Sequence, residues 1–455
     1  MLSSFVHIAQ RIGMDKSIAY SSGGNIIGGV TSVLVLLFIG TFLSECEQGF
    51  YFTFNSIIAI QVFFDLGLTG IMTQYVAHEQ AHLEWADNKV VLLGDKKYLS
   101  RLASLLSFSV KWFGIISFVF LFAIIVVGFV FFQHYEYDVD IEWKTPWCLL
   151  CLGTAINMFL APIMAYIMGL GKVDDVMRIR FYKLIIIPLI TCVGLWLGAK
   201  LYVLGIASLA TAIYNLLQVT NTQLGRILKG IWKTQISERV SYMKEVFPYQ
   251  WKIALSWISG YLIFQLFNPV LFATDGPAVA GQMGMTLQIL NAIIGLAMAW
   301  VNTKVPLFSR LIEMKQYREL DMIFNRTLKQ VSAVSLSLLL VMLAGVVLLH
   351  LTDIRIGGVA LYSRVLKEDA LLLMMGAMLA NMIVSSLATY LRCHKQEPML
   401  IQSVTMGVLT MASTFLLGHA FGLYGITTGY FILCSLVSLP WTCFLFMKYK
   451  TIWHK

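Results

Sequence analysis

The sequence predicts an all-α protein that crosses a membrane many times, and three observations lead to this class. Hydrophobic residues make up 58% of the 455 residues and charged residues only 13%, whereas an average soluble domain carries about 25% charged residues. The mean hydropathy is correspondingly high, at +0.77. Apolar stretches long enough to cross a hydrocarbon core of about 30 Å recur along the whole chain. We therefore expect a polytopic helical membrane protein.

Twelve segments have the length and polarity of membrane-spanning helices. Six lie in the first half, at residues 17–43, 49–76, 112–133, 146–170, 176–197 and 201–220. Six lie in the second half, at residues 251–273, 279–301, 328–349, 370–390, 399–419 and 423–447. We expect two six-helix bundles, formed by residues 1–225 and 251–455, with residues 226–250 as a cytoplasmic linker.

The two halves show a weak internal similarity. A shift of 232 residues superposes their hydrophobic segments and places Gly49 on Gly281 and Gly28 on Gly260. Because each half has an even number of helices, both have the same orientation, as expected for bundles related by an axis along the membrane normal. This predicts a pseudo-symmetric pair of bundles with a cavity between them.

Basic residues are concentrated on one side of the predicted topology. That side holds 28 of the 33 Lys and Arg residues, and cytoplasmic loops retain such an excess during insertion. We therefore expect both termini to be cytoplasmic. The net charge is +9, but the basic residues lie in short loops between apolar runs, where they set the topology. Nucleic acid is therefore not an expected partner.

The lengths of the loops and the cysteine pattern exclude several functions. No connecting loop exceeds about 35 residues, which leaves no room for a separate ATPase or catalytic domain, so we expect neither an enzyme nor a cofactor. The seven cysteines are scattered, and the Cys148/Cys151 pair has no second pair or histidine ligands near it, so we expect helix packing and no metal. The longest loop, 78–111, contains leucines opposite Lys97 and Arg101 and predicts an amphipathic helix on the inner leaflet.

Asp65 is the one deeply intramembrane acid, in the predicted helix 49–76. An aspartate near the membrane centre costs about 2.5–3.5 kcal/mol on insertion scales, so it should face protein or water. Gln61 and Thr69, one turn before and after it, extend a polar stripe on the same helix face. Asp65 is therefore the candidate for ion coupling.

Further polar positions in the first, second, seventh and eighth helices are candidates for a substrate cavity. They are the uncharged Asn25, Asn55, Gln61, Ser256, Gln288, Asn291 and Asn302, and the basic Lys16, Lys252 and Lys304. The alternative role for each amide is a hydrogen bond between two helices of the bundle, which is worth about 0.6 kcal/mol on average. Lys304 could equally extend to lipid headgroups, and Pro306 should kink or end its helix.

The sequence resembles the polysaccharide-export and O-antigen flippase family of the multidrug, oligosaccharidyl-lipid and polysaccharide (MOP) exporter superfamily. The resemblance covers the topology of the whole chain and rests on GFYFTFNSIIAIQVFFDLGLTGIMTQYVA, YQWKIALSWISGYLIFQLFNPVLF and AGQMGMTLQILNAIIGLAMAWVNTKVPLFS in helices two, seven and eight. It implies a MATE-like, V-shaped pair of bundles. Such a protein would carry an undecaprenyl-diphosphate-linked oligosaccharide, an O-antigen, capsule or exopolysaccharide unit, to the outer leaflet of the bacterial inner (cytoplasmic) membrane by alternating access.

The implied partners are the lipid-linked oligosaccharide, membrane lipids, a coupling H+ or Na+, and a polysaccharide polymerase with glycosyltransferases. Lysines would bind the diphosphate, and Tyr20, Trp257, Tyr261 and Trp300 would stack on sugars. The alternative within the same superfamily is a proton- or sodium-coupled exporter of small organic cations, with Asp65 as the exchanging acid. A membrane glycosyltransferase would need a larger outward loop than residues 352–369.

Overall fold

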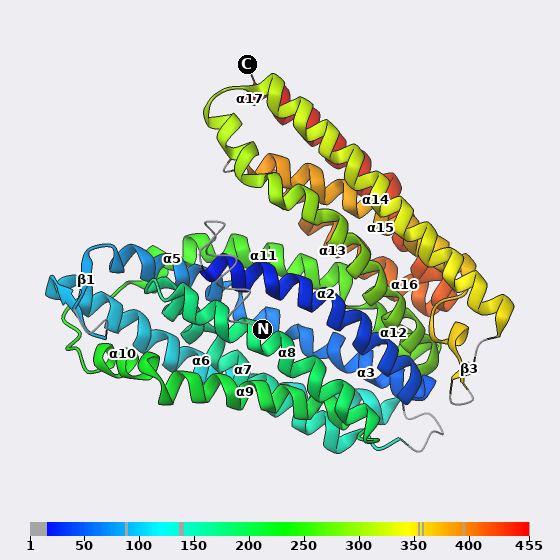
Figure 1. Cartoon of the computed structure of the whole chain (residues 1–455), viewed down its shortest axis with the longest axis horizontal. Helices are drawn as coiled ribbons and strands as arrows, with labels where there is room; N and C mark the ends of the chain where they lie inside the picture. The colour runs from blue at the N-terminus through cyan, green and yellow to red at the C-terminus, as the bar shows by residue number, and fades with distance from the viewer. Residues whose placement is uncertain are drawn as a thin grey trace. The chain divides into compact units, whose positions relative to one another are not determined.

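The computed structural model describes residues 16–86, 90–135, 141–353, 355–356, 359–394 and 396–454. Most of these residues are helical (Figure 1). The chain divides into two compact units, one with the described residues up to Phe38 and Ile58–Trp257, the other with Ile39–Ile57 and the residues from Ile258 onward. The predicted division into two six-helix bundles remains a prediction, with bundles at residues 1–225 and 251–455 and a linker at 226–250.

The first unit is built from long helices joined by short segments. These are α2 (Lys16–Phe42, which continues into the second unit), α4 (Val62–Asp65), α5 (Leu68–Gln80), α6 (Lys96–His134), α7 (Lys144–Gly169), α8 (Val173–Trp196), α9 (Tyr202–Asn221), α10 (Gln223–Trp232) and the first part of α11 (Phe247–Phe264). A 3-10 turn, η1 (Ala59–Gln61), precedes α4, and a π-helical turn, η2 (Tyr242–Val246), precedes α11. Strand β1 (Leu83–Trp85) pairs antiparallel with β2 (Leu92–Gly94).

The second unit also consists mainly of helices joined by short segments. It contains α3 (Glu45–Ile58), α12 (Phe267–Thr274), α13 (Pro277–Glu313), α14 (Tyr317–Thr352), α15 (Glu368–Arg392), α16 (Leu400–Ile432), the π-helical η4 (Leu433–Ser438) and α17 (Leu439–Trp453). Between α14 and α15 lie the paired strands β3 (Arg355–Ile356) and β4 (Val359–Ala360) and the 3-10 turn η3 (Leu361–Arg364).

The membrane-spanning class is confirmed. In the part of the chain that the structure describes, nine helices are long and apolar enough to cross a membrane, and the bent pair Glu45–Asp65 and Leu68–Gln80 makes a tenth. One of the nine, Leu400–Trp453, covers two predicted spans, and Gly422, at φ 57°, interrupts its helical geometry between them. On α6 the large apolar side chains Phe118, Phe122 and Val126 are more than half exposed, as expected for a helix that faces lipid.

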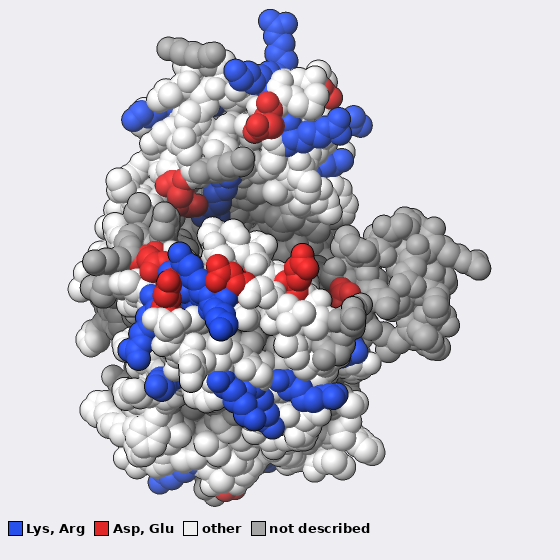
Figure 2. Space-filling model, turned by 90° about the vertical axis from the view of Figure 1, so that its left-hand side faces the viewer, with Lys and Arg blue, Asp and Glu red and all other residues white. Residues whose placement is uncertain are grey.

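Basic side chains gather at one end of the first unit. This is the end where α5 and α10 lie in Figure 1, and it faces the viewer in Figure 2, where acidic side chains lie among the basic ones. The charge distribution along the sequence predicts that this end is cytoplasmic.

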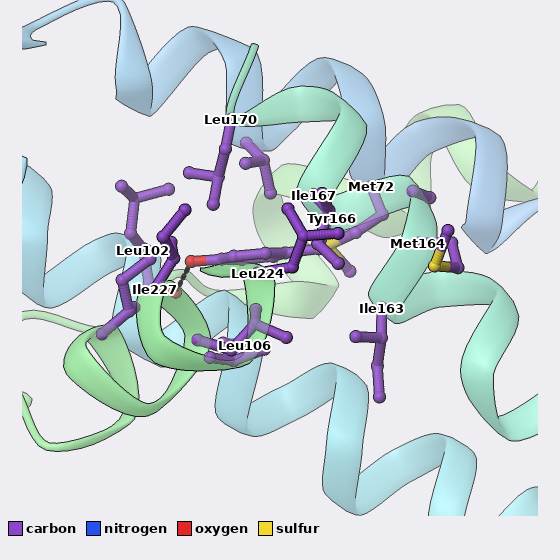
Figure 3. Close-up of a cluster of buried hydrophobic side chains, with 14 of the residues drawn as sticks. Met72, Leu102, Leu106, Ile163, Met164, Tyr166, Ile167, Leu170, Leu224 and Ile227 are labelled. Atoms are coloured by element: carbon purple, nitrogen blue, oxygen red, sulfur yellow. Dashed lines mark hydrogen bonds between the residues drawn. The ribbon is translucent and has the colours of Figure 1, made fainter. Parts of the chain in front are cut away.

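The core of the first unit corrects the prediction of an amphipathic helix on the inner leaflet. Helix α6 is continuous from Lys96 to His134, and the Asp95 carboxylate accepts a hydrogen bond from the Lys97 N–H (2.9 Å) at its start. Leu102 and Leu106 are buried against α7 and α10, and the Tyr166 hydroxyl donates to the Leu102 carbonyl (3.0 Å; Figure 3). The prediction was wrong because periodicity identifies an apolar face without identifying what covers it.

Candidate functional site

The second predicted span, 49–76, is broken at Asp65. Helix α4 ends there, and Leu66 (φ 49°) and Gly67 (φ 72°) both adopt left-handed backbone before α5 begins. The two helical parts meet at 42°. A Cβ at Gly67 would lie 2.6 Å from Ile253 Cγ2 of α11, so only glycine fits this turn. The expectation of one continuous helix over residues 49–76 was therefore wrong.

Asp65 forms hydrogen bonds to the first turn of α5. Its Oδ1 atom accepts hydrogen bonds from the Thr69 hydroxyl and from the Thr69 N–H (3.4 Å). The first turn of α5 has N–H groups without helical partners and a partial positive charge, both of which a carboxylate satisfies. The predicted Asp65–Thr69 proximity is thus present, but its two hydrogen bonds span the break between α4 and α5. Gln61 lies in η1, half-buried and without a hydrogen bond from its side chain to any described residue.

Broken helices at membrane depth are frequent where transporters bind ions and substrates, because the freed backbone groups line a cavity. The break at Asp65 combines a carboxylate, a hydroxyl and a helix N-terminus. Ser256 lies in the first unit on α11 and is half-buried, one turn beyond the Ile253 that contacts Gly67. The side chains of Lys16, Asn25 and Lys252 lie outside the part of the chain that the structure describes.

The second unit holds the other predicted polar residues. Asn55, on α3, is exposed, and its amide donates to the Tyr51 carbonyl of the same helix (2.9 Å). On α13, Asn291 and Asn302 are exposed and Gln288 is half-buried. None of these three α13 amides hydrogen-bonds to a described residue through its side chain. The structure therefore leaves them available on one uncovered face of α13, which we call the amide face.

Lys304 lies on α13 two residues beyond Asn302, outside the amide face. Its side chain is exposed, but its helical angle lies nearly opposite Gln288. Of the two outcomes expected at Pro306, a kink or an end of the helix, the end does not occur, because α13 continues to Glu313. Trp300, also on α13, is 46% exposed.

A charged cavity that sequence reasoning missed lies in the first unit. It has a volume of about 590 Å³, and Tyr75, His78, Glu79, Arg101 and Glu245 line it. Arg101 Nε donates to Glu79 Oε1 (2.8 Å), and Arg101 Nη2 donates to Glu245 Oε2 (2.7 Å). Two carboxylates therefore share one guanidinium.

The two acids of this cavity differ. Burial tends to raise the pKa of Glu245, but hydrogen bonds from Arg101 and from the Ser241 N–H (2.8 Å) outweigh it and lower the pKa. Glu79 is only 3% exposed, and its second oxygen, Oε2, has no hydrogen-bond partner among the described residues. The cavity thus presents one buried acceptor without a donor. Sequence alone places Glu79 and Glu245 in separate loops, and only the fold brings both to Arg101.

A second missed network lies in the second unit, around a buried arginine. Arg364 is 3% exposed, and its guanidinium donates to the Leu43 carbonyl and to Gln48 Oε1 (3.4 Å). Gln48 in turn donates to the carbonyls of Gly281 (2.8 Å) and Arg364 (3.0 Å). These bonds join α3 to α13 and to the segment before α15.

The backbone arrangement identifies the fold. The inward-facing structure of a multidrug resistance MATE family transporter of the MOP superfamily matches with a TM-score of 0.63, at 14% identity, over 94% of this chain and 96% of that one. The MATE multidrug transporter DinF-BH matches with a TM-score of 0.55, at 17% identity, over 95% of this chain and 94% of that one. The fold is that of the MATE transporters.

The same fold extends to a flippase. The inward closed structure of the lipid II flippase MurJ matches with a TM-score of 0.52 and 13% identity, over 95% of this chain and 89% of that one. No protein-family model and no curated protein sequence matches the chain. The fold is therefore assigned from the similarity to solved structures, and the substrate is inferred from the residues of this chain.

Proposed function

We propose that this chain is a flippase that moves an undecaprenyl-diphosphate-linked oligosaccharide, an O-antigen, capsule or other exopolysaccharide unit, from the inner to the outer leaflet by alternating access. The observation that carries the proposal is the amide face of α13. Unpaired amides on a spanning helix are unfavourable against lipid, so this face borders water or substrate. Amide groups suit the hydroxyls of a sugar, because they both donate and accept hydrogen bonds.

The MATE fold supports this proposal without deciding it, because that fold is shared by drug transporters and by the lipid II flippase. A diphosphate needs cations at the loading side. Lys304 lies near the end of α13 that the charge distribution predicts to be cytoplasmic, and Lys16 and Lys252 are the other proposed cations. Asp65, at the broken helix, is the proposed site of coupling to H+ or Na+.

The proposed location is the bacterial inner membrane, with both termini in the cytoplasm. A polysaccharide polymerase and glycosyltransferases would act after and before the flippase. In this proposal the chain performs no covalent chemistry itself.

Reconstitution tests the proposal. Proteoliposomes with a fluorescent polyprenyl-diphosphate glycan should move it between leaflets faster than protein-free liposomes. Asn291→Leu should slow this transfer at least tenfold, because the sugar loses an amide contact and meets an apolar group. Asn325→Leu, a change to an exposed amide of α14 outside the amide face, is the matched control. Equal rates with and without protein would refute the flippase.

A second function has one specific observation in its favour. The cavity around Arg101 contains two acids for one guanidinium and an unpartnered buried oxygen on Glu79, which favours a cationic ligand. A MATE-like exporter of small organic cations would use such a site. Export of a fluorescent organic cation that is lost in Glu79→Gln, with no glycolipid transfer by the unmodified protein, would select this alternative.

A further inference from the structure

A smaller cavity of about 360 Å³ lies in the first unit, between α6 and the segment 236–240. Its polar lining consists of Ser104, Ser107, Lys111 and Arg239, and Trp112 and Ile115 form an apolar side. We call it the α6 pocket. It is separate from the cavity around Arg101, with which it shares no lining residue.

The spacing of residues on α6 explains how the pocket forms. Ser100, Ser104, Ser107 and Lys111 follow each other at intervals of four, three and four residues, which places them on one helix face. The Ser100 hydroxyl accepts hydrogen bonds from the N–H groups of Ser237 and Glu238 (both 2.8 Å) and donates to the Glu238 carbonyl (3.0 Å). These three bonds hold the next residue, Arg239, beside the serine face.

The charges of the pocket are unbalanced. Arg101, also on α6, is paired with two acids, but neither Lys111 nor Arg239 forms an ion pair with any described residue. The hydroxyls of Ser104 and Ser107 likewise make no hydrogen bond to the described part of the chain, and no carboxylate lines the pocket. Two cations and two free hydroxyl donors within one cavity favour an anion with several oxygen acceptors.

The position of the pocket shows what kind of anion it suits. Lys111 and Trp112 lie where the predicted span 112–133 begins, and tryptophans are enriched at this depth of a membrane. Trp112 is 42% exposed and Ile115 is 64% exposed, on the side of α6 that carries the apolar residues facing lipid. A ligand bound here would have its charged part at the headgroup level and an apolar part against the hydrocarbon.

We propose that the α6 pocket binds the phosphate headgroup of an anionic phospholipid of the cytoplasmic leaflet. Arg239 and Lys111 form charge-assisted hydrogen bonds to the phosphate oxygens, and the two serine hydroxyls donate further bonds. Trp112 and Ile115 pack against the start of the acyl chains. The site does not depend on which substrate the protein transports.

The binding of phosphatidylglycerol to the full-length protein in neutral detergent tests this proposal, with phosphatidylcholine as the comparison lipid. Native mass spectrometry counts the bound lipids, and titration of a fluorescent phosphatidylglycerol gives the affinity. Lys111→Gln with Arg239→Gln should weaken phosphatidylglycerol binding roughly thirtyfold, because each basic residue near an anionic surface contributes about fivefold. Binding of phosphatidylcholine should be unchanged.

A matched control is Arg326→Gln with Lys329→Gln. These two exposed basic residues lie one turn apart on α14, and neither has an ion pair with a described residue, so the change in net charge is the same. The double variant Ser104→Ala with Ser107→Ala should weaken phosphatidylglycerol binding several-fold without changing the net charge. It replaces the Lys111→Gln, Arg239→Gln variant as the test if that protein is unstable. Equal losses in the α6 and α14 variants would overturn the proposal, as would displacement of the lipid by millimolar inorganic phosphate.

Discussion

At the scale of single residues, Asp65 illustrates how two roles can be separated. Its carboxylate accepts two hydrogen bonds from Thr69 at the start of α5, and it is also the proposed coupling acid. Asparagine keeps a side-chain oxygen that can accept these bonds, whereas alanine loses them, at about 0.5–1.5 kcal/mol for each bond. The charge and the hydrogen bonds of this side chain can therefore be removed one at a time.

We expect Asp65→Asn to keep the thermal stability of the purified protein within about 0.5 kcal/mol and to abolish the dependence of transport on pH or sodium. Asp65→Ala should lower stability as well. The measurements are thermal unfolding in detergent and transport in proteoliposomes across pH and sodium concentration. If Asp65→Asn transported with an unchanged response to both ions, Asp65 would be structural and coupling would occur elsewhere.

Two histidines near the end of α17 provide a pH-dependent contact. His394 and His454 lie with their Nε2 atoms 3.3 Å apart, and His454 stacks on Tyr317 at 4.1 Å between ring centroids. Burial lowers the pKa of both imidazoles from the ordinary value of 6.5, against opposing effects of hydrogen bonds at His394 and of Asp321 at both. Because the unfolded chain binds these protons more readily, this contact stabilises the fold fully above pH 6.5.

The protein should therefore lose thermal stability as the pH falls below 6.5, and His454→Phe should lose less, because phenylalanine keeps the stacking and cannot be protonated. Thermal unfolding at pH 5.0 and 7.5 measures the difference between the two proteins. His419→Phe, a change to an exposed histidine of α16, is the control and should follow the unmodified protein. A His454→Phe profile identical to that control would refute the assignment.

At the scale of elements, α3 and α13 meet at two glycines. A Cβ at Gly281 would lie 2.8 Å from the Gly49 nitrogen, and a Cβ at Gly49 would overlap the Pro277 carbonyl. The internal similarity of the sequence equates these same two positions. Small residues let helix backbones approach closely in membranes, which is why glycine occupies both sites.

Gly49→Ala should accordingly lower the stability of the protein by about 1–3 kcal/mol, the usual effect of overpacking. Gly345→Ala provides the contrast, because a Cβ at Gly345, within α14, meets no atom within 4 Å. There, alanine should be neutral or stabilising by up to about 1 kcal/mol. Thermal unfolding of both variants in the same detergent gives the comparison, and equal behaviour would show that α3 and α13 can separate without loss.

Helices also show where periodicity stops being informative. The leucines of α6 were expected to face lipid, but they pack on Tyr166 and on α10. The span 49–76 has the hydrophobicity of one helix, yet it is broken where Gly67 packs on Ile253. In both cases the local sequence is compatible with two arrangements, and a contact with a residue distant in the sequence selects one of them.

At the scale of the whole molecule, the distribution of basic residues predicts the orientation. Since 28 of the 33 Lys and Arg residues belong to the predicted cytoplasmic side, the orientation should be strongly determined. A protease added to right-side-out cells should leave a C-terminal epitope tag intact, and the same protease should remove the tag from inside-out vesicles. Removal of the tag from intact cells would place the C-terminus outside.

Composition and hydropathy by themselves determined the class of this protein, because burying every backbone polar group in lipid leaves a helix as the solution for each long apolar run. They also predicted where most spans lie and on which side of the membrane the basic loops should be. Local polarity was enough to select the α13 amides, which the structure leaves uncovered.

Only the tertiary structure decided where helices break and which charges meet. Arg101 pairs with Glu79 and Glu245, Arg364 is buried, and Arg239 and Lys111 line one pocket. In each case the contacts come from segments that are far apart in the sequence. A charge or a serine in a loop has the same local sequence whether it faces water or a partner. Its role follows from long-range packing, which the order of residues along one chain does not display.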